Sequence, residues 1–302
     1  MAADWQQKER TLPFFLHITS WIVQNLGRSV GRLLLPFIIG YYLLFARTAK
    51  QHSRQYLRRV LPLEHGKIRF RDIFRHFHAF GAVTLDRLVL LSGGLNKLEV
   101  TVSGPDSLYE YQKSGQGCLL LVSHVGSFEA LRVVGNEQDK LPIKILMNKS
   151  VSGRMLQVID ALNPEMANAI IDVSERGPQV IFDVQNALNN GNMVGVMADR
   201  CFSPNEATID VPFLGGTAAF PQSPWLLAAA TKVPVIVCFG WYLGGNRYHV
   251  EFQELTNSLT ADRRDRSGSL QRACQQYANT LEQGLRKHPL NWFNFFDFWK
   301  RQ

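Results

Sequence analysis

The chain has 302 residues, 46% of them apolar, so it is long enough for one large domain or two small ones with a buried core. Its 33 Lys and Arg residues outnumber its 25 Asp and Glu residues, and the net charge of +8 suits an acidic partner. The four cysteines are scattered without a Cys-x-x-Cys spacing, which argues against a zinc site and a disulfide framework and fits a reducing compartment.

The first 60 residues differ in composition from the rest of the chain. The apolar run LLLPFIIGYYLLF, residues 33–45, is 13 residues long. A helix that crosses a bilayer needs about 18 to 20 such residues. We therefore expect two helices, at about 13–26 and 30–48, that embed in or lie along a membrane face. A pair of buried core helices is the alternative.

A basic stretch follows these apolar helices. Between residues 47 and 75 nine Lys and Arg residues stand against two acidic ones, which gives +7. Positive charge beside an apolar segment is typical of the cytoplasmic flank of a membrane protein and suits anionic headgroups, although a solvated helix face has the same pattern. No nucleic-acid-binding module accompanies the charge, so nucleic acid is not expected as a partner.

From about residue 68 onward, helical patterns alternate with short apolar runs. Strands are expected at 98–102, 118–122, 143–147, 193–198, 233–241 and 247–252, the last two joined by a hairpin turn at 244–246. Helices are expected at 70–91 and near 127–135, 151–162, 177–190, 221–231 and 267–287. This alternation predicts an α/β fold with a mixed, largely parallel sheet flanked by helices. We expect membrane-associated helices in residues 1–60 and one catalytic domain in residues 61–302.

One predicted strand delivers a histidine and an acid to the same turn. His124 lies two residues beyond the strand 118–122, Gly126 permits a tight turn, and Ser127 suits the N-cap of a following helix. Reactive groups of α/β sheets gather at the carboxyl ends of the strands. Glu129 comes one turn later, where its carboxylate would orient His124 as a general base. Ordinary loop chemistry would also account for these residues.

Spacing alone is weak evidence, because His249 and Glu254 repeat it. His249 lies in an alternating strand and is expected to be structural. His76 and His78 lie in a helical stretch without a third ligand nearby in sequence, so no metal site is expected. The chain has no Gly-x-Ser-x-Gly elbow, Walker loop or Rossmann glycine pattern, which disfavours a serine hydrolase or a nucleotide-binding enzyme.

The motifs of the central region resemble a known family. SHVGSFE, residues 123–129, resembles the His-x4-Asp/Glu motif of the lysophospholipid acyltransferase superfamily, closest to the bacterial branch of late (lauroyl and myristoyl) acyltransferases of lipid A biosynthesis. GNMVGVMADRCFSPNEATIDVPFLGG, residues 191–216, and PQSPWLLAAATKVPVIVCFG, residues 221–240, resemble later blocks of that branch. The tail NWFNFFDFW, residues 291–299, resembles a sub-branch found in aryl polyene pigment clusters.

The resemblance implies an O-acyltransferase with His124 as general base, Glu129 as the group that orients it, and no acyl-enzyme intermediate. The donor would be a thioester of acyl carrier protein or coenzyme A, the acceptor a hydroxyl of a lipid or glycolipid, and no cofactor is implied. Asp199 and Arg200 end the strand 193–198 at the same sheet edge, where Arg200 would hold a phosphate. A local ion pair between Asp199 and Arg200 is the alternative, and Arg200 stands where lipid A enzymes often carry Gln or His.

Three further residues are candidates for substrate binding. Arg154 would contact a phosphate, with an exposed helix arginine as the alternative. Gly215 and Gly216 would let the backbone approach the donor or supply an oxyanion N–H, and a simple turn explains them equally well.

Two other functions fit the same residues. The His–Glu pair would serve an esterase or thioesterase with water as the acceptor, and a non-catalytic membrane-associated module would need no base. For the acyltransferase we expect the cytoplasmic face of a bacterial inner membrane, with anionic membrane lipid and acyl carrier protein as partners.

Overall fold

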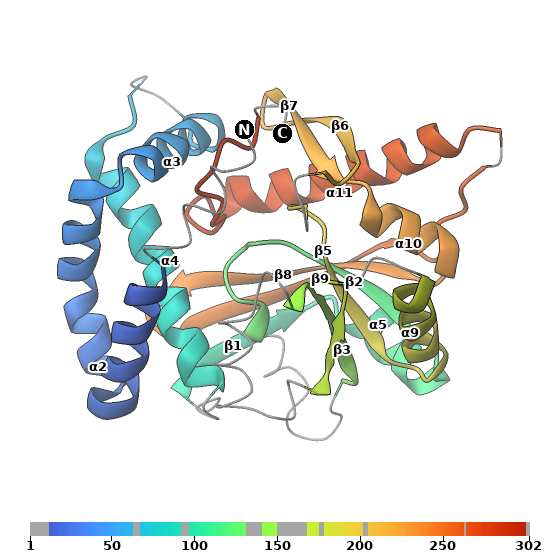
Figure 1. Cartoon of the computed structure of the whole chain (residues 1–302), viewed down its shortest axis with the longest axis horizontal. Coiled ribbons are helices and arrows are strands. Elements are labelled where there is room, and N and C mark those ends of the chain that lie inside the picture. The colour runs from blue at the N-terminus through green and yellow to red at the C-terminus, as the bar shows by residue number, and fades with distance from the viewer. Residues whose placement is uncertain are drawn as a thin grey trace.

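A seven-stranded sheet forms the centre of the molecule in the computed structural model (Figure 1). The structure describes residues 12–62, 67–91, 97–130, 141–149, 168–174, 178–201, 205–262 and 264–299, with side chains from Gly27 onward. The strand order is β1-β9-β8-β2-β5-β3-β4, and every neighbouring pair is parallel except β8–β9. A separate antiparallel hairpin consists of β6 and β7. The predicted α/β class with a largely parallel sheet is therefore confirmed.

The elements have the following bounds. The strands are β1 (Glu99–Ser103), β2 (Cys118–Val122), β3 (Ile143–Met147), β4 (Ile170–Asp172), β5 (Met193–Met197), β6 (Thr208–Phe213), β7 (Gly216–Pro221), β8 (Val235–Gly244) and β9 (Arg247–Thr256). The helices are α2 (Leu12–Phe45), α3 (Arg47–Val60), α4 (Phe70–Leu91), α5 (Asp106–Ser114), α9 (Pro178–Asn189), α10 (Ser223–Thr231) and α11 (Arg266–Lys287), with one 3₁₀ turn, η3 (Phe128–Ala130).

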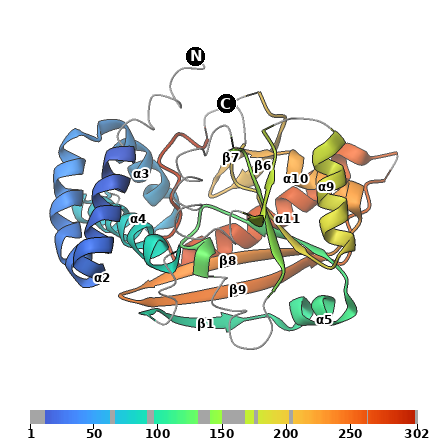
Figure 2. The same cartoon turned by 60° about the horizontal axis from the view of Figure 1, so that its bottom comes forward.

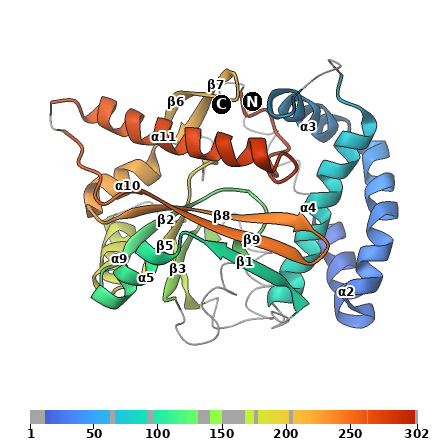
Figure 3. The same cartoon turned by 180° about the vertical axis from the view of Figure 1, so that it is seen from behind.

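Strand β2 is buried on both faces because helices cover both sides of the sheet. Leu119 and Leu121 point into the larger core, which includes α11, α10, α9 and the β6–β7 hairpin. Leu120 and Val122 point into a second core with Leu108 of α5. Figure 3 shows α11 running along one face of the sheet. This double cover explains why β2 reads as an uninterrupted apolar run.

The N-terminal helices pack at the carboxyl edge of the parallel strands. Arg28 and Arg32 of α2 contact the buried Asp86 carboxylate of α4, and both donate to the carbonyl of Gly245, just after β8. Tyr248 of β9 also donates to Asp86, at 2.8 Å. The cluster α2–α3–α4 is seen as one group in Figure 2. These contacts hold α2 against the edge of the sheet at which β8 ends.

Helix α2 presents two apolar faces. Leu35, Ile39 and Leu43 are buried in the main core, whereas Leu33, Phe37, Tyr41, Leu44 and Phe45 are exposed, Phe37 by 73%. Within the described part of the chain, Gly27–Phe45 is long and apolar enough to cross a membrane by length and composition. Gly27 has a non-helical backbone (φ 81°) and divides α2 into two helices, as predicted.

Local predictions agree with most of the elements. The bounds of β2, β3 and α4 are those predicted, and the β8–β9 hairpin forms with its turn in the predicted place. The predicted helix at 127–135 is described only as the short turn η3, and the predicted helix at 151–162 lies outside the described residues. Helices α3 and α5, strand β4 and the β6–β7 hairpin were not predicted. The division of the chain at residue 60 stays a prediction.

Candidate active site

The register of two neighbouring strands places His124 opposite Asp199. Strands β2 and β5 are parallel, and Val122 pairs with Met197 at their carboxyl ends. Ala198 continues the ladder by donating its backbone N–H to the carbonyl of Val122 at 2.9 Å. Each of the two site residues lies two positions beyond its paired strand residue. Because parallel strands present their carboxyl ends at one edge, the two side chains meet there.

Asp199 holds the His124 ring through one of the two ring nitrogens. Nδ1 of His124 lies 2.9 Å from Oδ1 of Asp199, and the backbone N–H of His124 donates to Oδ2 at 3.0 Å. An ionised carboxylate only accepts hydrogen bonds, so Nδ1 carries the proton and Nε2 keeps its lone pair. The His124 side chain is 31% exposed, whereas that of Asp199 is fully buried. This pair has the arrangement of a general base and its orienting acid.

Two residues near the C-terminus complete the surroundings of Asp199. Trp292 Nε1 donates to Oδ2 at 2.9 Å, and Asn294 Nδ2 donates to the same oxygen at 3.3 Å. Burial by itself favours the neutral acid, but the electrostatic interaction with the His124 ring and the hydrogen bonds from His124 and Trp292 hold the pKa of Asp199 below its ordinary value. The carboxylate is therefore ionised at neutral pH, as an orienting group must be.

A glycine contact fixes the turn that carries His124. Gly126 adopts φ +49° and lies against Gly240 of β8, where a Cβ on either glycine would overlap the backbone of the facing segment. Ser127 donates its backbone N–H to the carbonyl of Gly240 at 2.8 Å. Only glycine at both positions permits this approach. The turn is therefore held against β8. This strand neighbours β2 on the side opposite to β5.

Glu129 does not hold the His124 ring, contrary to the expectation from the sequence. Its carboxylate accepts from the Ser127 hydroxyl at 3.1 Å, and its Oε1 lies 2.7 Å from Nε of Arg87 on α4. Ser127 therefore binds a carboxylate instead of capping a helix. The expected contact with the ring does not form, because Glu129 follows the turn as the chain enters η3 and contacts α4, whereas Asp199 reaches the ring from the end of β5.

Of the two other arginines predicted at the site, the structure describes only Arg200. Arg200 is exposed, and its guanidinium lies 5.2 Å from the centre of the Phe296 ring. Its neighbour Asp199 is bound to His124, Trp292 and Asn294, which disfavours the local ion pair that was the alternative. Arg154 lies outside the described residues.

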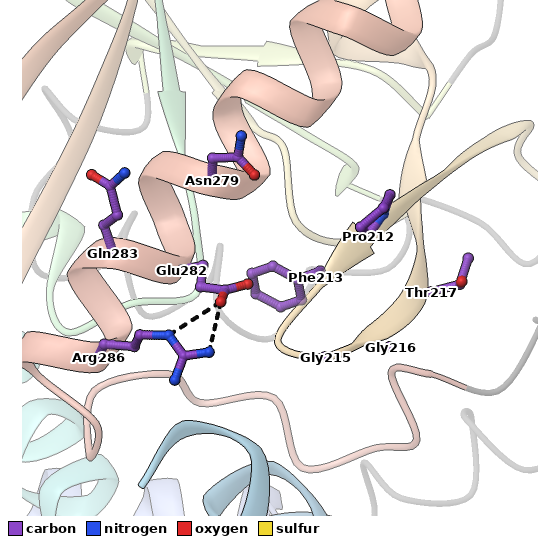
Figure 4. Close-up of a pocket in the computed structure, with 9 residues that line it drawn as sticks. All are labelled: Pro212, Phe213, Gly215, Gly216, Thr217, Asn279, Glu282, Gln283 and Arg286. Carbon is purple, nitrogen blue, oxygen red and sulfur yellow. Dashed lines mark hydrogen bonds and ion pairs between the residues drawn. The ribbon is translucent and has the colours of Figure 1, made fainter. Parts of the chain in front are cut away.

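Gly215 and Gly216 form the tip of the β6–β7 hairpin. They line an open pocket of about 620 Å³ between this hairpin and α11, with Thr217, Asn279 and Arg286 on its polar walls (Figure 4). Phe213, before the tip, packs against the Trp292 ring with centroids 5.4 Å apart. The tip is thus connected to Asp199 through two aromatic rings.

Trp292 and Asn294 are not among the residues predicted at the site. They belong to the aromatic tail that resembles one sub-branch of the family, but no local pattern relates them to a strand end. The available signal was the presence of asparagines among aromatic residues, since a buried amide needs polar partners.

A family model described as bacterial lipid A biosynthesis acyltransferase matches residues 5–301. No curated protein matches the chain. The matched range contains the His124 turn, the end of β5 and the residues near the C-terminus that contact Asp199.

Proposed function

Because the chain belongs to the bacterial lipid A biosynthesis acyltransferase family, we propose that it moves a fatty acyl chain from a thioester to a hydroxyl of a lipid or glycolipid, with His124 as general base. Acyl transfer to a lipid is the activity of the family. The finer statement is carried by one observation: Asp199 fixes Nδ1 of His124, which leaves Nε2 free to accept a proton. We infer no sub-branch of the family.

The proposed reaction needs only a base and a thioester. Nε2 of His124 takes the proton of the acceptor hydroxyl as its oxygen attacks the thioester carbonyl, and Asp199 stabilises the imidazolium that forms. The tetrahedral intermediate then expels the thiolate, which receives the proton from His124. Glu129 contributes by holding the turn to Arg87. No acyl-enzyme forms, and no cofactor takes part.

The remaining candidates are assigned to substrate binding. Arg200 is exposed beside Asp199 and would meet a phosphate of the donor or the acceptor. Gly215 and Gly216 offer backbone next to the polar pocket, which suits the polar part of a substrate. Arg154 keeps its proposed role as a phosphate contact from the sequence alone.

We assign acyl carrier protein as the donor carrier, with coenzyme A as the alternative. The basic residues of α3 and of the start of α4 are exposed or half-buried. They provide a wide positive surface, and acyl carrier protein is strongly acidic, so opposite charge would speed their encounter. These residues are Arg47, Lys50, Arg54 and Arg58 of α3, Arg69 just before α4, and Arg71 and Arg75 of α4.

We place the molecule on the cytoplasmic face of the bacterial inner membrane, with the outer face of α2 in anionic lipid. A row of exposed apolar side chains over four turns of helix is typical of a surface that meets lipid. The opposite face is buried against α4, so lipid would surround only one side of the helix. The basic surface of α3 begins directly after this row, which favours anionic headgroups over a neutral surface.

The test compares the purified protein with His124→Ala in transfer from acyl carrier protein and coenzyme A thioesters to a bacterial lipid extract. Loss of the base should lower kcat by about 10²- to 10⁴-fold. His249→Ala is the control, because His249 contacts Thr101 and Ser103 on β1 and no reacting group. Wild-type rates with His124→Ala would refute the proposal, and free fatty acid as the sole product would favour the hydrolase.

A further inference from the structure

The C-terminal strap, residues 291–299, lies directly against the His124 turn. The backbone N–H of Phe293 donates to the carbonyl of His124 at 2.8 Å, and the N–H of Gly126 donates to the carbonyl of Asn291 at 2.9 Å. Val125 and Trp292 form an isolated antiparallel bridge between these bonds. The strap therefore pairs with the catalytic turn as a short extra strand.

The two carboxylate oxygens of Asp199 accept hydrogen bonds from different donors, and two of these donors belong to the strap. Oδ2 accepts from Trp292 Nε1 and Asn294 Nδ2 of the strap and from the backbone N–H of His124. Oδ1 accepts from the His124 ring. A carboxylate with three donors on one oxygen cannot rotate without losing their hydrogen bonds, and hydrogen bonds to a charged group are stronger than those between neutral groups. Oδ1 is thus kept facing the imidazole.

The strap is in turn held by the N-terminal helices. Tyr56 of α3 donates to the carbonyl of Pro289 at 2.9 Å, just before the strap, and the Arg59 guanidinium lies 4.4 Å from the centre of the Trp299 ring. His76 of α4 bonds the carbonyl of Trp292 at 2.8 Å. Both helices therefore support the segment that orders Asp199.

We propose that Trp292 and Asn294 are positioning residues, which set the orientation of Asp199 and thereby keep Nε2 of His124 directed at the acceptor hydroxyl. The inference rests on the proposed function, since it assigns a support to the proposed base. Neither residue takes part in proton transfer. Their removal lowers the fraction of molecules in which the base is correctly placed, so kcat falls and KM does not change.

The test is a double-mutant cycle that joins Trp292→Phe with Asp199→Asn. Trp292→Phe keeps most of the ring packing and removes only the N–H donor. It should lower kcat by about 10- to 100-fold with KM for donor and acceptor unchanged, since the lost bond is to a charged group. In the Asp199→Asn background the same substitution should lower kcat less than twofold, because residues that act as one unit are not additive.

Trp241→Phe is the matched control. Trp241 is also fully buried and also donates Nε1 to a carboxylate, that of Glu251 at 2.8 Å, away from Asp199. It should leave kcat within about twofold of wild type. If Trp292→Phe instead proves too unstable to purify, Asn294→Ala enters the same cycle, with a smaller loss expected because its bond is longer.

The outcomes separate the inference from the proposed function. If Trp292→Phe and Asn294→Ala lower kcat no more than Trp241→Phe, or if their effects multiply with that of Asp199→Asn, the inference is wrong while His124 remains the base. If His124→Ala retains the wild-type rate, the proposed function itself fails.

Discussion

At the scale of single residues, the site depends on which carboxylate reaches the histidine. Asp199 is fully buried, ionised and hydrogen-bonded to Nδ1 of His124, whereas Glu129 accepts a hydrogen bond from Ser127 and forms an ion pair with Arg87. Both acids were expected near His124, but their roles differ. Asp199 orients the ring, and Glu129 ties the turn to α4.

Double-mutant cycles can distinguish the role of Glu129 from that of Asp199. Glu129→Gln keeps an acceptor for Ser127 and removes the charge opposite Arg87, so we expect a loss of activity of about tenfold or less. Arg87→Gln should give a similar loss, and the double variant should lose little more, because both changes break one contact. When Glu129→Gln is combined with Asp199→Asn, we expect the two losses of activity to multiply, as they do for independent residues. If the effect of Glu129→Gln instead depended strongly on Asp199 and not on Arg87, Glu129 would be a residue that orients the His124 ring.

At the scale of elements, α2 has two apolar faces, one buried and one exposed. The face of Leu35, Ile39 and Leu43 packs into the core, and the face of Leu33, Phe37 and Tyr41 is exposed. A soluble surface helix would carry polar residues on its outer face. The second apolar face is therefore available for lipid.

Removing the exposed face should release the molecule from lipid without unfolding it. The triple variant Leu33→Ser, Phe37→Ser, Tyr41→Ser should lose most of its binding to anionic vesicles in a flotation assay. Each fully inserted large apolar side chain contributes about 1.5 to 3 kcal/mol. Phe182→Ser is the matched control, because Phe182 of α9 is 67% exposed on another part of the fold. Equal flotation of the triple variant and the wild type would rule out α2 as the lipid-facing element.

Helix α3 carries the charges that we assign to the donor. Reversal of Arg47, Arg54 and Arg58 to Glu should lower kcat/KM for the acyl carrier protein thioester and flatten its decrease with salt. Arg59 is unsuitable for this reversal, because it donates to the carbonyl of Leu214 and packs on Trp299. The coenzyme A thioester serves as the comparison. If coenzyme A is the better donor, or if the reversal leaves the salt dependence unchanged, the basic surface belongs to the lipid.

At the scale of the whole molecule, helices α3 and α4 and the C-terminal strap meet at one buried histidine. His76 is fully buried, with Ser53 of α3 at 2.9 Å from Nδ1 and the Trp292 carbonyl at 2.8 Å from Nε2. A carbonyl only accepts, so Nε2 carries the proton and Nδ1 accepts from Ser53. Burial lowers the pKa of His76 to about 4 from its ordinary value of 6.5, although the bond to Trp292 opposes this.

This histidine makes stability depend on pH. The folded state binds the proton of His76 less readily than the unfolded state, so stability is complete above about pH 6.5 and falls as the pH decreases toward 4. About 2 kcal/mol of the unfolding free energy should be lost between pH 7.5 and 5. Urea unfolding at the two pH values should show a smaller difference for His76→Gln. Phe77→Leu, a core change that removes no titrating group, should keep the wild-type difference. An unchanged difference in His76→Gln would contradict the assignment.

The sequence by itself determined the elements whose pattern is local. The short apolar run 118–122 favours a strand buried on both faces, and the periodicity of 70–91 defines α4, so both were predicted with their observed bounds. His124 and Asp199 were predicted at one sheet edge because each follows a strand end, and that depends only on short segments of chain.

Only the tertiary structure decided which acid contacts His124. Asp199 is 75 residues from His124, and Trp292 is 93 residues from Asp199. Their contacts depend on β5 lying beside β2 and on the strap returning from α11 to the His124 turn. Strand order and chain return are set by the packing of distant segments into a common core, and a local hydrophobic pattern contains no information about either.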